Sequence, residues 1–293
     1  MSSSDGKMPA PDGLRRRELR LRILSALVMV PVALGATIWG GAAFGALTAL
    51  ASALIFLEWT AIVTRNKASR ITTIGAVLIV VAIVLDAHAQ PNRAIVTATL
   101  AWLLVAVAAY RLEAGSKRSW LALGPGYALL PGLALVSLRS DHPLGLTAVL
   151  FLFAVVWSTD IAAYFTGRAL GGPKLWPAVS PNKTWSGALG GLAAAVAAGS
   201  AVAAAGDVPR LLPLVGVAAV LSVASQAGDL FESAVKRRFG VKDSGSIIPG
   251  HGGVMDRLDG LIFAAVIAAA IGLWRAPEAP LARGLLAQGL LAW

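Results

Sequence analysis

"KRRFGVKDSGSIIPGHGGVMDRLDG" forms residues 236–260, between apolar stretches at about 210–232 and 260–274. The quoted stretch carries five of the chain's 25 basic residues and three of its 15 acidic residues. A charged segment between two long apolar runs is typical of two membrane-spanning helices joined by a loop. The sequence therefore predicts a charged loop at a membrane surface.

The composition of the whole chain also predicts a membrane protein. Hydrophobic residues make up 57% of the sequence, charged residues only 14%, and the mean hydropathy is +0.74. Soluble globular domains are clearly more polar. The apolar runs predict an all-α, polytopic integral membrane helix bundle with about nine transmembrane helices. These helices are expected at about 23–40, 43–63, 71–88, 94–112, 120–138, 144–166, 187–206, 210–232 and 260–274.

The predicted domain organisation has three parts, because no long polar segment remains for a separate soluble domain. A basic, cytoplasmic N-terminal arm covers 1–22, a transmembrane catalytic bundle covers 23–275, and a short C-terminal tail covers 276–293. Within the bundle, polar residues concentrate around two predicted active-site loops, at about 167–187 and 229–259. The absence of cysteine excludes disulfides and thiolate metal sites.

The distribution of Lys and Arg predicts the orientation. A cytoplasmic N-terminus places 20 basic residues in cytoplasmic segments and five outside. This asymmetry follows the positive-inside rule and predicts a cell (inner) membrane protein with cytoplasmic active-site loops. The Arg-rich start also resembles a signal peptide, but its apolar run continues to Gly40, which favours an uncleaved first helix. The basic residues are scattered over short loops, which argues against nucleic-acid binding.

A polar stripe runs along the predicted helix 210–232 and just beyond it. Its members step by four and three residues and so share one helix face: Ser222, Gln226, Asp229, Ser233 and Lys236. Glu232 adjoins the stripe. A helix that merely emerges into water would explain Glu232 and Lys236, but it explains Gln226 and Asp229 less well, because carboxylates at membrane depth normally face a bundle interior or a wet cavity.

The predicted helix 144–166 repeats this arrangement. Asp160, Tyr164 and Arg168 are spaced four apart and share one face. The structural alternative is that Asp160 and Arg168 neutralise partners in the bundle. Two helices that each direct an Asp to the same cytoplasmic level are better explained by one shared site.

Residues 171–187, "GGPKLWPAVSPNKTWSG", are predicted to form a structured turn region. Lys174 and Lys183 supply positive charge, and Thr184 or Ser186 is expected to cap the helix that follows. A Lys beside a helix N-terminus fits a phosphate site, because free N–H groups and the helix dipole favour anions. A capped helix with lysines that set topology would give the same pattern.

The opening stretch carries the strongest chemical signal. Asp256 and Asp259, three residues apart, are expected to project to one side, and with Asp229 they could hold Mg²⁺. Four cations are placed to neutralise phosphate: Arg237, Arg238, Lys242 and Arg257. His251 fits either a phosphate contact or a structural hydrogen bond in the loop.

In the first half of the chain, Glu58 and Glu113 lie near helix ends, and an interfacial role is expected for both.

Carboxylates for a divalent cation, basic residues for several phosphates and access from the bilayer together fit phosphoryl or nucleotidyl transfer to a lipid. The chain resembles the phosphatidate cytidylyltransferase family in the pattern Ser-x-apolar-Lys-Arg, Lys-Asp and His-Gly-Gly-apolar-x-Asp-Arg-apolar-Asp. Its residues here are Ser233, Lys236, Arg237, Lys242, Asp243, His251, Gly252, Gly253, Asp256, Arg257 and Asp259. The segments "SPNKT" and "GDLFES" are also similar to the family.

The resemblance implies that CTP and phosphatidate are converted to CDP-diacylglycerol and pyrophosphate with Mg²⁺, with a second metal or a monovalent cation left open. The implied catalytic residues are Asp229, Lys236, Arg237, Asp256, Arg257 and Asp259, and the implied metal ligands are Asp229, Asp256 and Asp259. The implied substrate-binding residues are Asp160, Arg168, Lys174, Ser180, Lys183, Thr184, Ser233, Lys242, His251, Gly252 and Gly253. Where many relatives have Glu, this chain has Ser186, so no carboxylate role is carried over to that position.

Two alternatives stay open at this point, namely another CTP-using membrane enzyme such as a polyprenol kinase, and an ion or solute transporter. A transporter would not need the glycine-rich, basic loop. The expected partners are CTP, phosphatidate and the lipid bilayer, with no nucleic acid, and a homodimer is left open.

Overall fold

The computed structural model describes residues 12–65, 70–88, 91–112, 115–140, 143–248, 250, 252–275 and 286–293. These residues form ten helices and one two-stranded hairpin. The elements are α1 (Asp12–Trp39), α2 (Gly41–Thr64), α3 (Arg70–Ala87), α4 (Pro91–Leu112), α5 (Lys117–Ser140), α6 (Gly145–Leu170), β1 (Lys174–Trp176), β2 (Ser180–Thr184), α7 (Trp185–Ala205), α8 (Leu212–Arg238), α9 (Met255–Arg275) and α10 (Leu286–Leu291).

The predicted membrane helix bundle is confirmed. Each of the nine predicted apolar segments coincides with one of the helices α1 to α9. Among the described residues, seven helices are long and apolar enough to cross a membrane, while the apolar parts of α1 and α3, Ile23–Trp39 and Thr72–Ala87, are shorter. The number nine therefore stays a prediction.

The bundle has two buried cores. Helices α2 to α5 pack around the fully buried rings of Phe56 and Trp59, and helices α6 to α10 pack around Phe151 and Leu214. The second core includes Leu290 of α10, so part of the predicted C-terminal tail belongs to the bundle.

Small residues allow the helices of the second half to approach closely. A Cβ on Gly187 or Gly191 of α7 would lie 2.7 Å from a backbone oxygen of α6. A Cβ on Gly228 of α8 would lie 2.5 Å from the carbonyl oxygen of Asp259 in α9. Glycine at these positions therefore fixes the distances between α6, α7, α8 and α9, which carry the polar residues predicted from the sequence.

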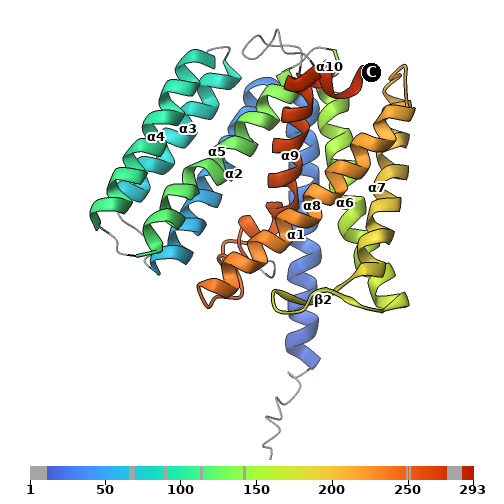
Figure 1. Ribbon diagram of the computed structural model, residues 1–293, viewed down its shortest axis with the longest axis horizontal. Helices are drawn as coiled ribbons and strands as arrows, with labels where there is room; N and C mark the ends of the chain where they lie inside the picture. The colour runs from blue at the N-terminus through green and yellow to red at the C-terminus, as the bar shows by residue number, and fades with distance from the viewer. Residues whose placement is uncertain are drawn as a thin grey trace, which may run out of the picture.

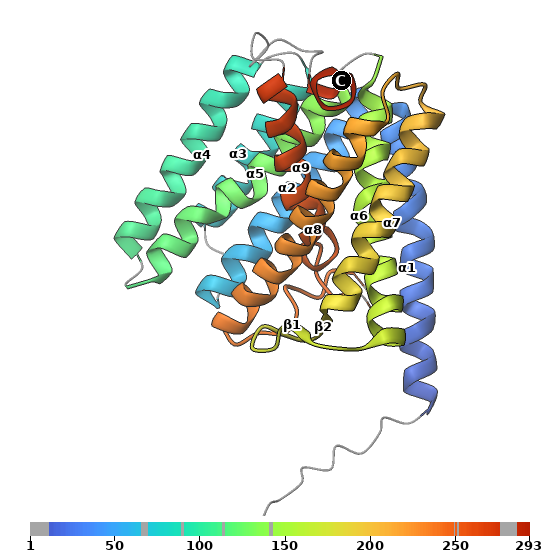
Figure 2. The ribbon, with the colours of Figure 1, turned by 45° about the vertical axis from the view of Figure 1, so that its right-hand side comes forward.

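Both predicted active-site loops lie at the same end of the bundle (Figures 1 and 2). The region 171–187 contains the antiparallel hairpin β1–β2, in which Lys174 pairs with Thr184 and Trp176 with Ser180. The hairpin, the α8–α9 loop and the first turns of α1 lie at the lower end in both views, and α10 lies at the opposite end. This arrangement brings residues 160, 183, 229 and 256 to one level of the molecule.

Candidate active site

Glu58 of α2 anchors the start of α9, although it is distant in sequence. It is only 4% exposed, and its two carboxylate oxygens accept hydrogen bonds from the backbone N–H groups of Val254 at 2.9 Å and Met255 at 2.8 Å. The first N–H groups of a helix have no partner within it, and a carboxylate there is also favoured by the helix dipole. The predicted interfacial role of Glu58 is wrong, because the carboxylate is buried in this contact. Glu113 lies outside the described residues.

Asp256, in the first turn of α9, also binds the α8–α9 loop. One of its oxygens, Oδ2, accepts hydrogen bonds from the N–H groups of Ser244 at 2.9 Å and Gly253 at 2.8 Å, and from the Ser244 hydroxyl at 2.9 Å. The same hydroxyl lies 3.0 Å from Glu58 Oε2. A Cβ on Gly253 would lie 2.0 Å from the Ser244 oxygen, so only glycine fits there without displacement. We call Glu58, Ser244, Gly253 and Asp256 the anchoring cluster.

Lys236 joins this cluster to a buried carboxylate of α8. Its ammonium nitrogen lies 2.6 Å from Asp256 Oδ1 and 2.7 Å from Glu232 Oε2. Glu232 is fully buried, and its Oε1 has no hydrogen-bond partner among the described residues. The alternative in which α8 merely carries Glu232 into water is therefore wrong. A buried carboxylate with an unpartnered oxygen needs a nearby cation or proton.

The β1–β2 hairpin contacts the polar stripe of α8. Lys183 of β2 forms an ion pair with Asp229, whose Oδ1 also lies 3.4 Å from the Ser233 hydroxyl. Arg237 donates a long hydrogen bond of 3.5 Å to the carbonyl of Val179. The structure thus joins residues 167–187 to the stripe through Lys183, a contact that the sequence did not predict.

Thr184 caps α7, as the sequence predicted for Thr184 or Ser186. Its hydroxyl accepts a hydrogen bond from the N–H of Gly187 at 3.1 Å. Ser186 instead donates to the carbonyl of Gly171 and lies 3.0 Å from the Thr184 hydroxyl. Ser186 therefore ties the C-terminal end of α6 to the start of α7.

Helix α6 reaches the site through Asp160. The neighbouring Thr159 shares a 2.9 Å hydrogen bond with Ser222 of α8, which fixes α6 against the polar stripe. Asp160 is exposed and lies within electrostatic reach of Asp229, Lys183 and Arg257. Further along the same face, the Arg168 guanidinium donates to the Tyr164 hydroxyl at 2.9 Å.

Asp160, Asp229 and Asp259 form a second carboxylate group, which we call the acidic cluster. Asp259 of α9 lies within electrostatic reach of both other members and of Glu232. Among the described residues, the Asp259 carboxylate accepts one hydrogen bond, from the N–H of Gly260 at 2.8 Å. Unlike the anchoring cluster, the acidic cluster thus retains carboxylate oxygens that no loop N–H group occupies.

Two of the aspartates offer ligands for a divalent cation. Among the described residues, no three acidic or histidine side chains are close enough to bind one ion. Mg²⁺ is commonly held by one or two carboxylates together with water and substrate phosphates, so Asp229 and Asp259 fit such an ion. Asp256 is less available, because Lys236 and the loop N–H groups occupy its oxygens. Binding of one ion by all three aspartates stays a prediction.

The remaining predicted residues lie around these two clusters. Lys174 and Lys242 are exposed at the loop end, and Ser180 is half-buried in the hairpin. Gly252 has φ +84°, a conformation that favours glycine, and a Cβ there would lie 2.8 Å from Asp256 Oδ2. His251 lies outside the described residues. Glu58 and Glu232 are the carboxylates whose buried contacts the sequence reasoning did not identify, and an acidic residue inside or next to an apolar run was the available signal for both.

The fold and the site define an integral membrane enzyme that assembles carboxylates and basic side chains at one end of its helix bundle. The comparisons with known proteins then specify the family. The sequence pattern of the cytidylyltransferase family matches residues 20–273, and the chain belongs to this family.

Three bacterial relatives illustrate the similarity. The chain is 46% identical to phosphatidate cytidylyltransferase from Brucella suis biovar 1 (strain 1330) over 266 residues, 89% of this chain and 96% of the relative. It is 37% identical to phosphatidate cytidylyltransferase from Pseudomonas aeruginosa over 88% of this chain and 98% of the relative. It is 33% identical to phosphatidate cytidylyltransferase from Staphylococcus aureus (strain COL) over 84% of this chain and 95% of the relative.

Proposed function

We propose that this protein transfers the cytidylyl group of CTP to phosphatidate and so produces CDP-diacylglycerol and pyrophosphate for phospholipid synthesis. The observation that carries the proposal is the contact between the family's charged loop and the α8 stripe, through Lys236 and Asp256, in a chain of this family. In this reaction, a phosphate oxygen of phosphatidate attacks the α-phosphorus of CTP. The bond from that phosphorus to the bridging oxygen breaks, and pyrophosphate leaves with the electron pair.

The chemistry does not require a protein base. A phosphate monoester has a second pKa of about 6, so the nucleophile is already largely anionic at neutral pH. The barrier arises from bringing two polyanions together in line. Positioning and charge neutralisation are therefore the tasks of the protein.

The basic residues at the site suit these tasks. Lys236 and Arg237 project from the last turn of α8, Arg257 from the first turn of α9, and Lys242 from the loop between them. We assign phosphate binding to these four side chains, with Arg257 and Arg237 able to bind two phosphate oxygens at once. The ion pair of Lys236 with Asp256 and Glu232 holds its ammonium group in place before substrate arrives.

Asp229 and Asp259 would hold the Mg²⁺ ion of this reaction. A bound Mg²⁺ would supply charge neutralisation for the phosphates of CTP and for the leaving pyrophosphate. The buried Glu232 lies close to these ligands and is paired with Lys236.

We also propose that the site faces the cytoplasm, on the basis of the 20-to-5 distribution of basic residues. The chain contains no cysteine, so single-cysteine reporters are unambiguous. In intact cells, Gly250→Cys should resist a membrane-impermeant maleimide, while Asp207→Cys in the α7–α8 loop should react. Labelling of Gly250→Cys by the impermeant reagent would reverse the orientation. A homodimer stays a prediction.

The decisive test of the activity uses purified protein with phosphatidate and CTP that is labelled in the α-phosphate. We expect label in the lipid, one pyrophosphate released per labelled lipid, and no reaction after EDTA treatment. A kinase would transfer the γ-phosphate and leave the α-label in the nucleotide. Label that stays in nucleotide while phosphatidate is present would contradict cytidylyl transfer.

A further inference from the structure

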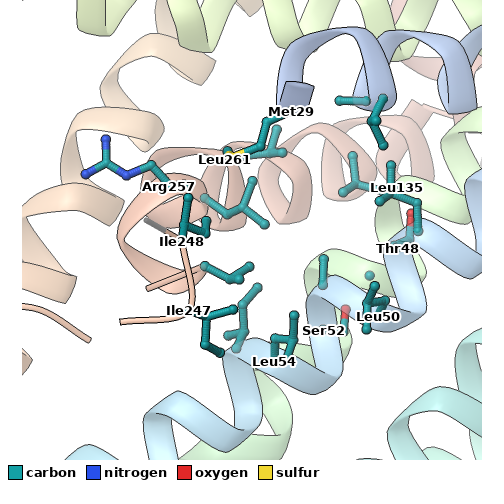
Figure 3. A pocket seen from close by; sticks show the side chains of 18 of the residues that line it. Met29, Thr48, Leu50, Ser52, Leu54, Leu135, Ile247, Ile248, Arg257 and Leu261 are labelled. Carbon is teal, nitrogen blue, oxygen red and sulfur yellow. The ribbon is translucent and has the colours of Figure 1, made fainter. Parts of the chain in front are cut away.

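A large apolar cavity lies between α1, α2, α5, α9 and the α8–α9 loop. Its volume is about 660 Å³. Of the described residues that line it, Arg257 alone is charged, and nearly all others are aliphatic or aromatic. Figure 3 shows apolar side chains from α1, α2, α5 and the loop facing this space, with the Arg257 guanidinium extending away from them.

Helix α9 separates the cavity from the carboxylates. Arg257, Leu258 and Leu261 line the cavity, whereas Asp256 reaches Lys236 of α8 from the other side of the same helix turns. Asp259, three residues after Asp256, lies on the same side of α9 as Asp256. On a helix of 3.6 residues per turn, position 257 lies at the border between these two faces. The guanidinium of Arg257 is also within electrostatic reach of Asp160 in the acidic cluster. Arg257 therefore marks the place where the cavity meets the proposed phosphate site.

Helix α6 gives the direction of the cavity relative to the site. Phe153 lines the cavity, and Asp160 follows it by seven residues, which places both on one face with about 10 Å between them along the axis. Both Phe44 and Ile55 of α2 line the cavity. Phe44 lies in the first turn of α2, remote from the loop, while Ile55 lies three residues before Glu58, which accepts a hydrogen bond from Val254. The cavity thus extends from Arg257 into the membrane-spanning part of the bundle.

We propose that this cavity binds one acyl chain of phosphatidate while Arg257 contacts its phosphate, an inference that rests on the proposed function. A long apolar space with one cation at its border is complementary to an amphipathic ligand with an anionic head. A free nucleotide has no hydrocarbon chain that could fill the apolar part of the cavity. A zwitterionic phospholipid has the acyl chains but a less suitable head group for an Arg beside a phosphate-transfer site.

The physical contribution of the cavity is selection and orientation. An acyl chain that arrives from the bilayer is already in an apolar medium, so its transfer into the protein yields little hydrophobic free energy. Close packing, in contrast, depends on chain length and shape, and a chain fixed in the cavity fixes the phosphate relative to the α-phosphorus of CTP. Residues remote from the loop are therefore expected to determine acyl-chain preference.

Two valines of α1 provide a matched pair for the test. Val32 lines the cavity and is 51% exposed, whereas Val30 is 42% exposed and does not line it. Both side chains belong to the same helix and are exposed to a similar degree, so the same enlargement can be compared at the two positions. Activity would be measured with phosphatidate that carries two 16-carbon or two 8-carbon chains, each dispersed in the same mixed micelles.

We expect Val32→Trp to lower the ratio of kcat/KM for the 16-carbon to the 8-carbon substrate by about tenfold, because the longer chain needs the occupied volume. Val30→Trp should leave the ratio at the parental value. An equal ratio in all three proteins, or an equal change in both variants, would overturn the proposal. If the parent forms no CDP-diacylglycerol from either substrate, the proposed function fails instead.

A binding experiment separates substrate from bulk lipid and does not depend on turnover. Phosphatidate with a photoreactive diazirine near the end of one 16-carbon chain would be irradiated with the full-length protein, and the labelled peptides identified. We expect labels on α1 or α2 near residues 28–33 and 44–51, reduced by unlabelled phosphatidate but not by phosphatidylcholine. Labels elsewhere, or equal competition by both lipids, would show that the cavity is not a phosphatidate site.

Discussion

The anchoring cluster and the acidic cluster contain the same kind of side chain at the same end of the bundle, but their surroundings differ. In the anchoring cluster, Glu58 and Asp256 accept hydrogen bonds from the N–H groups of the α8–α9 loop and from Ser244. In the acidic cluster, Asp229 pairs with Lys183 through one oxygen and accepts a 3.4 Å bond from the Ser233 hydroxyl through the other. Among the described residues, Asp259 accepts one hydrogen bond, from the N–H of Gly260. The anchoring carboxylates are bound by backbone N–H groups of the loop, whereas Asp229 is contacted only by side chains among the described residues, and we propose that the acidic cluster binds the ion.

Because their surroundings differ, we propose separate tasks for two carboxylates that lie close together in sequence. Asp256 and Asp259 are three residues apart in one helix, yet Asp256 is engaged by Lys236 and the loop, while Asp259 lies at the crossing with α8. We therefore expect changes in the acidic cluster to act mainly on turnover, and changes in the anchoring cluster to act on stability as well. The following substitutions test that division.

The largest effect is expected for Asp229→Asn and Asp259→Asn. Each should lower kcat/KM by at least about 100-fold, since the lost charge acts directly on the reacting phosphates. Because the two side chains act together, the double variant should be scarcely slower than either single variant. Asp207→Asn, at an exposed position at the opposite end of the bundle, is the control and should leave turnover unchanged. Near-normal turnover of Asp259→Asn would remove it from the site.

Gly253→Ala is expected to be the most damaging single change in the anchoring cluster. The added methyl group would meet the Ser244 hydroxyl at 2.0 Å and Glu58 Oε2 at 2.5 Å. We expect a loss of about 3 kcal/mol of stability, measured by thermal unfolding in detergent. Gly216→Ala provides the control, because no atom lies within 4 Å of that added methyl group. Equal melting temperatures for the two variants would show that the loop is not packed as described.

Glu58→Gln should cost about 2 kcal/mol, because an amide NH₂ group replaces one acceptor of the α9 N–H groups. The apparent KM for CTP should change less than kcat, since Glu58 positions the loop and makes no proposed contact with substrate. Thr60→Val removes a hydroxyl that bonds only to the backbone of α2 in the described contacts, and it should have a smaller effect on both properties. A Glu58→Gln protein with parental stability would exclude the anchoring role.

Much of this arrangement could be predicted from the sequence. The long apolar runs define the helices. The four-residue steps from Asp160 to Tyr164 and on to Arg168, and from Asp229 to Ser233, can be read directly from the sequence. The contact of Glu58 with Val254 could not be predicted, because it joins residues 196 positions apart. The hydrogen bonds that occupy the Asp256 carboxylate could not be predicted either. The sequence shows the carboxylate, but it does not show which backbone N–H groups lie beside it in the folded protein.

The smallest effect is expected for Ser186→Ala. Its hydroxyl donates to the carbonyl of Gly171, so its loss should cost about 1 kcal/mol of stability and little turnover. Thr184→Ala is the informative comparison, because Thr184 is the α7 cap and should cost at least as much. A marked rise in KM for CTP or phosphatidate in Ser186→Ala, without loss of stability, would instead place this hydroxyl in contact with substrate.

The most direct test of the division between the two clusters is the binding of Mn²⁺, used in place of Mg²⁺, by purified protein with a non-hydrolysable CTP analogue. Electron paramagnetic resonance of the unbound ion would be compared for the parent, Asp229→Asn, Asp259→Asn and Asp256→Asn. We predict that Asp256→Asn retains Mn²⁺ affinity within about threefold of the parent, while the other two lose more than about tenfold. A loss of affinity in Asp256→Asn as large as that in Asp229→Asn would contradict the division and restore a three-aspartate ion site.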